Sequence, residues 1–149
     1  MNEVAAEVST KVHALPTKIW DCLTDLPTLS KYFMGAKVRT DWHVGHSITW
    51  SGEWKGEAYE DKGTVMAFDR NKRLSFSHWS AMGGTTDEPS NYHLVDILLD
   101  TGGAETEVRL LQTNLEGGLT DADREHRADY EKNWSAMLEG LKQTVEAKA

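Results

Sequence analysis

The stretch TDADREHRADYEKNWSAMLEGLKQTVEA, residues 120–147, decides the fold. Thr120 is a good helix N-cap, and the carboxylates that follow it suit the positive end of a helix dipole. Gly140 is the only weak helix former in the run. The apolar and partly apolar side chains recur at helical steps and form one stripe: His126, Tyr130, Trp134, Met137, Leu138, Leu141 and Val145. At about 1.5 Å per residue the helix is roughly 40 Å long, so it needs a broad apolar surface to pack on.

The residues before this helix predict the elements that supply such a surface. Apolar and charged residues alternate over residues 3–13, which predicts a strand with one exposed face. Two short helices should follow, one beginning at Pro16 and one over residues 27–33 that Gly35 ends. Further strands are expected over residues 36–42, 47–54, 64–68, 74–79, 92–100 and 105–114. A turn is expected over residues 60–63 and a longer loop over residues 80–91.

This order of elements predicts an α+β fold with a curved antiparallel β-sheet of about six or seven strands wrapped on the long C-terminal helix. The length suits a single domain over residues 1–149. A curved sheet does not close flush on a straight helix, so we expect a cavity between them. The part of the helix around His126, Tyr130 and Trp134 should border the cavity mouth. The part around Leu138 and Leu141 should pack closely on the sheet.

Composition narrows the class of partner. The chain has 149 residues, a net charge of −8 and no basic cluster beyond Arg70, Lys72 and Arg73. An acidic surface of this kind makes nucleic acid or an anionic membrane an unsuitable partner. No apolar run is long enough to cross a bilayer, and no signal pattern opens the chain. Cys22 is the only cysteine, which excludes an internal disulfide and favours a cytoplasmic location.

Several stretches resemble one family. They are DWHVG at residues 41–45, ITWSGEWKG at 48–56, YEDKG at 59–63, PSNYH at 89–93, Asn133-Trp134, and residues 14–25. Together they are similar to the family named after the activator of the ninety-kilodalton heat-shock protein's ATPase. That family belongs to the START-like superfamily, so the resemblance implies a helix-grip fold over nearly the whole chain. Because that fold hosts ligand binders, cyclases and chaperone partners, the resemblance implies no single function.

Strand parity predicts which side chains face the cavity, because successive residues on a strand point to opposite faces. The expected lining is mostly apolar and aromatic, with a few polar groups among the strand residues, as in a small-molecule site. It comprises Trp20, Phe33, Ile48, Trp50, Phe76, His78, His93, Val95, Gln112, Asn114, Tyr130, Trp134 and Met137. The helix residues among them are core residues first.

Several of these groups have a simpler structural interpretation. His78 and His93 each lie near a strand end, where an imidazole can bond a loop carbonyl instead of a ligand. A catalytic acid–base role for either would need a substrate proton within reach. The other clusters predict no catalytic or metal site and no cofactor: Asp41, His43 and His46 suit a solvated turn, Cys22 a small buried residue, and Glu53, Glu57 and Glu60 a solvated acidic edge.

Three functional hypotheses remain. The first is a binding protein that holds a hydrophobic or amphipathic small molecule between sheet and helix. The second, implied by the resemblance alone, is a protein-binding module that activates a chaperone ATPase or acts as another stress-response partner. The third is a cyclase- or hydrolase-like enzyme that uses His78 or His93 in the cavity.

Overall fold

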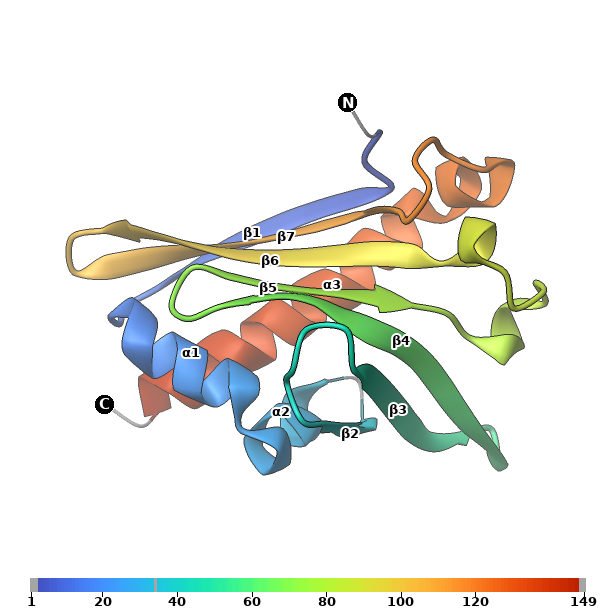
Figure 1. Ribbon diagram of the computed structural model, residues 1–149. Coiled ribbons are helices and arrows are strands. Elements are labelled where there is room, and N and C mark those ends of the chain that lie inside the picture. Colours follow the sequence, from blue (N-terminus) through green and yellow to red (C-terminus); the bar gives the residue numbers. More distant parts are fainter. Residues whose placement is uncertain (1–2, 34, 148–149) are drawn as a thin grey trace.

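The computed structural model describes residues 3–33 and 35–147 (Figure 1). The elements follow one another in this order: β1 (Ala6–Val12), α1 (Pro16–Thr24), α2 (Leu26–Tyr32), β2 (Lys37–Thr40), β3 (Ser47–Trp54), β4 (Glu57–Asp69), β5 (Arg73–His78), the 3-10 turns η1 (Ala81–Gly83) and η2 (Pro89–Asn91), β6 (His93–Gly102), β7 (Glu105–Asn114) and α3 (Asp121–Ala147). None of the described helices is both long and apolar enough to span a membrane.

Over the described residues, seven strands form one antiparallel sheet in the order β1-β7-β6-β5-β4-β3-β2. The long helix α3 lies across one face of the curved sheet, and the short helices α1 and α2 lie beside it (Figure 1). The structure therefore confirms the predicted α+β fold with a helix-grip arrangement, including the two short helices after the first strand.

The two short helices form where the sequence predicts them. Pro16 occupies the first turn of α1, and the buried side chains Ile19 and Leu23 lie one turn apart on its inner face. Asp25 separates the two helices and caps the second, because its carboxylate accepts a hydrogen bond of 3.3 Å from the backbone N–H of Thr28. The chain can therefore change direction without leaving the start of α2 unsatisfied.

The turn predicted over residues 60–63 is wrong. These residues lie inside β4, and the hairpin between β3 and β4 turns at Lys55 and Gly56 instead. Both turn residues have positive φ, 52° and 84°, as a two-residue hairpin turn requires. Gly63 has a different role, since a Cβ built on it would lie 1.7 Å from the carbonyl oxygen of Ser77. It permits two strands to approach closely and does not mark a turn.

The core lies between the sheet and the second half of α3. That half buries Met137, Leu138, Leu141 and Val145, each at most 1% exposed. The close packing around Leu138 and Leu141 was predicted. Gly140 packs closely against α2, because a Cβ there would lie 2.7 Å from Cβ of Tyr32 in that helix. The weak helix former in α3 is therefore a packing requirement.

Both edge strands of the sheet are bonded by side chains from the helices. Along the free edge of β1, the Glu131 side chain of α3 accepts a hydrogen bond of 3.0 Å from the backbone N–H of Glu7. The Glu146 side chain of α3 accepts another of 3.0 Å from the backbone N–H of His13, which follows β1. Arg127 of α3 donates to the carbonyl of Val4 at 3.2 Å on the same edge. At the other edge, the Val38 N–H of β2 donates to the Ser30 hydroxyl of α2 at 3.1 Å.

Candidate functional site

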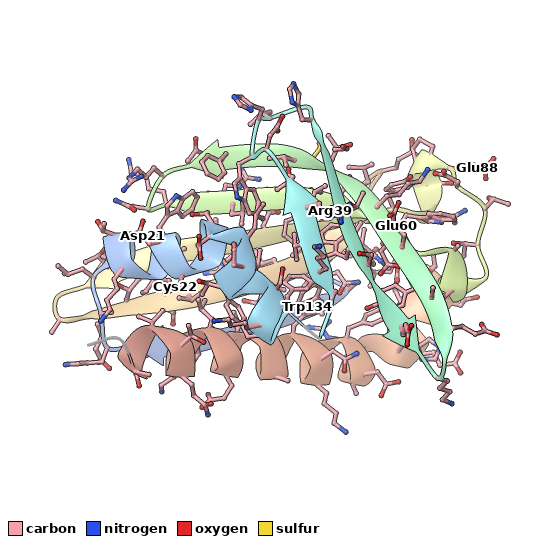
Figure 2. The ribbon with its side chains drawn as sticks, turned by 90° about the horizontal axis from the view of Figure 1, so that it is seen from below. Asp21, Cys22, Arg39, Glu60, Glu88 and Trp134 are labelled. Carbon is pink, nitrogen blue, oxygen red and sulfur yellow. The ribbon has the colours of Figure 1, made fainter. Side chains whose placement is uncertain are left out.

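A pocket of about 500 Å³ lies between the sheet and the N-terminal half of α3. Part of its wall is aromatic. The ring of Phe33, which follows α2, stacks on the ring of Trp50 of β3 with 6.1 Å between their centroids. The same ring meets the ring of Trp134 of α3 edge-on, with 5.8 Å between their centroids. Figure 2 shows Trp134 on the side of α3 that faces α2 and the strands. The first half of α3 therefore borders this pocket, while its second half packs in the core.

The thirteen residues predicted from strand parity and helix spacing divide into two groups. Eight border the pocket: Phe33, Trp50, His78, His93, Gln112, Asn114, Tyr130 and Trp134. The other five lie in the core and outside the pocket lining, each at most 2% exposed: Trp20, Ile48, Phe76, Val95 and Met137. Parity applies only to the strand residues Ile48, Phe76 and Val95. They belong to the hydrophobic core, as do Trp20 of α1 and Met137 of α3. Ligand contact by any of the thirteen stays a prediction.

The first polar feature of the pocket is the Asp61–His78 pair. Nε2 of His78 lies 2.9 Å from Oδ2 of Asp61, whose side chain is 16% exposed. The imidazole also meets the ring of Trp50 edge-on at 5.0 Å. Its partner is thus a carboxylate and not the loop carbonyl considered from the sequence. Asp61 was missed because its stretch was expected to be a turn, whereas β4 directs it into the pocket.

The second polar feature is the Asp123 cluster, made of Asp123, His93, Asn114 and Thr120. The Asp123 carboxylate is 2% exposed, and it lies 2.8 Å from Nε2 of His93 and 2.8 Å from Nδ2 of Asn114. It also accepts from the backbone N–H of Thr120 at 3.1 Å, while the Thr120 hydroxyl accepts from the N–H of Asp123 at 3.1 Å. This reciprocal pair caps α3, so one carboxylate both starts the helix and holds it to β6 and β7.

The same contacts determine the charge of the cluster. Burial favours the neutral form of Asp123, but the hydrogen bonds from His93, Thr120 and Asn114 outweigh it and hold the pKa of Asp123 below its usual range. Burial and the nearby Asp123 charge raise the pKa of Tyr130, whose hydroxyl lies 3.5 Å from that carboxylate. At neutral pH the pocket therefore contains a buried carboxylate beside a neutral phenol.

Antiparallel register explains why residues far apart in sequence meet here. Trp50 pairs with Asp61 across β3 and β4, and His78 pairs with His93 across β5 and β6. His93 in turn pairs with Asn114 across β6 and β7. The polar groups therefore form a row across one face of the sheet, at the end where the first half of α3 covers it. Such a row can bind the polar atoms of a molecule whose apolar part contacts the aromatic wall.

Two buried side chains of the pocket lining, Trp134 and Gln112, are hydrogen-bonded to each other. The indole Nε1 of Trp134 donates to Oε1 of Gln112 at 2.6 Å, and the two side chains are 8% and 4% exposed. The bond fixes the orientation of the Trp134 ring between α3 and β7. Gln112 is therefore engaged in positioning the aromatic wall.

The remaining candidate groups lie away from this pocket. Asp41, His43 and His46 are exposed in the turn before β3, with donor atoms within 4.8 Å of one another. The His43 N–H and the His46 ring hydrogen-bond to Asp41, which lowers the pKa of that carboxyl to about 2. Cys22 is buried in α1, as predicted, and Glu53 is exposed on β3.

A curved antiparallel sheet gripping a long C-terminal helix over a pocket defines a helix-grip domain of the START-like class. Within this class, residues 13–146 match the family model described as activator of Hsp90 ATPase homolog 1-like protein. The chain therefore belongs to that family, and its fold supports a ligand-binding or activator-type module in general. No curated protein matches the sequence.

Solved structures share the fold. The chain is 40% identical to ChR145 from Cytophaga hutchinsonii, with a TM-score of 0.78, and the match covers 99% of this chain and 97% of that one. It is 22% identical to MLL2253 from Mesorhizobium loti, at a TM-score of 0.74 over 96% and 98% of the two chains. It is 21% identical to a protein described as the Aha1 dimer from Colwellia psychrerythraea, at a TM-score of 0.67 over 95% of each chain. The last two likenesses establish the fold alone.

Proposed function

We propose that this protein binds a small amphipathic molecule in the pocket between the sheet and the first half of α3. The observation that carries the proposal is the pocket itself, which combines about 500 Å³ of space with an aromatic wall and a row of polar groups. Ligand sites typically measure about 300–1,000 Å³ and have this mixture of apolar surface and few polar groups. The size suits a molecule of one to three rings or a medium-length chain.

The polar groups support a binding role more strongly than a catalytic one. The imidazole of His93 is held by a carboxylate that also bonds Asn114 and caps α3, so this contact ties helix to sheet. The Asp61–His78 pair is similarly packed against the ring of Trp50. Groups fixed in this way orient a ligand without having to change their protonation.

The experiment is a titration of the purified protein with N-phenyl-1-naphthylamine, a neutral probe whose fluorescence increases in apolar surroundings. We expect saturable binding of one probe per chain. Ala122 lines the pocket at the start of α3, and Ala122→Phe should fill part of it and weaken binding about tenfold or more. Ala128→Phe is the matched control, because Ala128 is an exposed alanine of the same helix outside the pocket lining.

Four results would decide against the proposal. Equal binding by the two phenylalanine variants would place the probe elsewhere, and absence of any saturable binding would remove the binding role. If the probe does not bind but the protein stimulates a chaperone ATPase at micromolar concentration, the activator hypothesis replaces this one. Mass spectrometry of the recovered probe checks for chemical change, which would favour the enzymatic hypothesis.

A further inference from the structure

Two residues of the pocket lining each have one buried polar atom without a hydrogen-bond partner among the described residues. Nε1 of Trp50 and Oδ1 of Asp61 are both buried, and neither has a hydrogen-bond partner among the described residues. Both residues line the pocket, and Trp50 is 2% exposed. The other buried atoms in this condition belong to residues outside the pocket lining: Asn71, Ser75 and Thr113.

The two unused atoms belong to neighbouring side chains. Trp50 and Asp61 are direct partners in the register of β3 and β4, so their side chains leave the sheet on the same face. Directly opposed residues of antiparallel strands have Cβ atoms about 5 Å apart. The side chains that carry the donor and the acceptor therefore begin side by side on the face of the sheet that borders the pocket.

Neighbouring side chains contact both groups. The ring of Trp50 stacks on the ring of Phe33, with 6.1 Å between their centroids. It also meets the imidazole of His78 edge-on, with 5.0 Å between the centroids. The other carboxylate oxygen of Asp61 is occupied by Nε2 of His78 at 2.9 Å. Because buried polar groups without partners are costly and rare, their presence in a pocket indicates atoms that a ligand satisfies.

A donor beside an acceptor selects for a ligand group that is both. A neutral hydroxyl accepts from an indole N–H and donates to a carboxylate oxygen at once. A ligand carboxylate offers only acceptors and would lie beside Asp61, where like charges repel. A pure hydrocarbon would leave both protein atoms unsatisfied.

We propose that this part of the pocket binds a hydroxyl group, alcoholic or phenolic, of an otherwise apolar ligand, with Trp50 as its donor and Asp61 as its acceptor. The inference rests on the proposed function, since it requires a small molecule in the pocket. It adds the chemical class of the ligand: a neutral hydroxylated compound, in preference to a fatty-acid-like anion or a hydrocarbon.

The test compares three probes of one shape, 2-naphthol, naphthalene and 2-naphthoate, by calorimetric titration of the wild-type protein at neutral pH. We expect 2-naphthol to bind about tenfold more tightly than naphthalene, as one or two satisfied hydrogen bonds allow. The naphthoate should bind more weakly than the naphthol. Trp50→Phe keeps a ring but removes the N–H, and it should reduce the preference for naphthol to within about twofold.

Trp20→Phe is the matched control, because Trp20 is an equally buried tryptophan outside the pocket lining. It should keep the wild-type preference. Asp61→Leu removes the acceptor and tests the inference independently if Trp50→Phe fails to fold, with circular dichroism as the check of folding. Tight binding of all three probes without preference, or a preference that survives loss of the donor or of the acceptor, overturns the inference but leaves the binding role. Failure of every probe to bind overturns both.

Discussion

His93 at the start of β6 and Asp123 in the first turn of α3 are joined at 2.8 Å, although they belong to the two layers that enclose the pocket. The bond closes a set of contacts in which one buried carboxylate serves an imidazole, an amide and a backbone N–H. The helix therefore has a fixed starting point on the sheet, beside the place where the layers separate to form the pocket.

The first prediction concerns this carboxylate. Asp123→Ala should lower the free energy of unfolding by about 3 kcal/mol, because His93, Asn114 and the Thr120 N–H lose a buried acceptor together. Asp121→Ala is the matched control in the same turn, since the Asp121 side chain is fully exposed and should contribute less than about 1 kcal/mol. Urea denaturation measures both. Equal losses would show that Asp123 acts only through the helix dipole.

The lowered pKa of Asp123 predicts a pH dependence with a definite sign. Because the folded pKa lies below the ordinary value of 3.8, the stabilisation is fully present above that pH and is lost as the pH falls through the folded pKa. The unfolding free energy of the wild type should therefore fall faster below about pH 4 than that of Asp123→Asn. The gap between the two proteins should narrow in acid. A gap that stays constant from pH 6 to pH 2 would contradict the assignment.

Gly63 supplies a prediction about the close approach of β4 and β5. Gly63→Ala would place a methyl group 1.7 Å from the Ser77 carbonyl oxygen, so the strands must separate. We expect a loss of more than about 2 kcal/mol, measured by thermal and urea unfolding. The control is Gly102→Ala in β6, where the nearest atom would be Glu105 O at 3.9 Å and the change should cost less than about 1 kcal/mol.

For Gly140→Ala, close packing and helix propensity predict opposite changes in the free energy of unfolding. Replacing a helical glycine with alanine ordinarily stabilises by about 1 kcal/mol. Here the new Cβ would lie 2.7 Å from Cβ of Tyr32, which cannot move aside easily because its hydroxyl donates to the Cys22 carbonyl at 2.9 Å. Gly140→Ala should therefore destabilise by about 1–2 kcal/mol.

A second variant on α3 calibrates this result. Ala136→Gly, at an exposed position of the same helix, measures the propensity effect without the steric one and should cost about 1 kcal/mol. If Gly140→Ala instead stabilises by the amount that Ala136→Gly loses, the contact with Tyr32 has no energetic weight.

The sequence predicted the fold where local patterns carry the information. The 3-to-4 residue spacing over α3 identified its buried residues from Trp134 to Val145, and alternation identified the inward faces of the strands, because burial imposes those periods directly. His126, at the start of the predicted stripe, is exposed. The prediction from the sequence was wrong at residues 60–63, where the charged residues and Gly63 are typical of a turn. The glycine is required there by Ser77 on a neighbouring strand, and no local pattern records that contact.

The candidate site was predictable only in part, for a related reason. His78 and His93 could be placed on the inward face by parity, but their partners Asp61 and Asp123 could not be found from strand periodicity. Asp61 required the correct extent of β4. Asp123 required its cap geometry, for which the spacing of three residues from Thr120 was the available signal.

The helix contacts at the two sheet edges have a consequence for association. An open sheet exposes unpaired N–H and C=O groups on its outer strands, which can template aggregation with another chain. Along β1 and the residues that flank it, the side chains of Arg127, Glu131 and Glu146 already bond such groups, at Val4, Glu7 and His13 respectively. The flank of α3 beside its buried stripe therefore blocks this edge of the sheet. Removing both carboxylates, in Glu131→Ala with Glu146→Ala, should leave the domain folded but prone to strand-mediated self-association, detected by light scattering at high concentration.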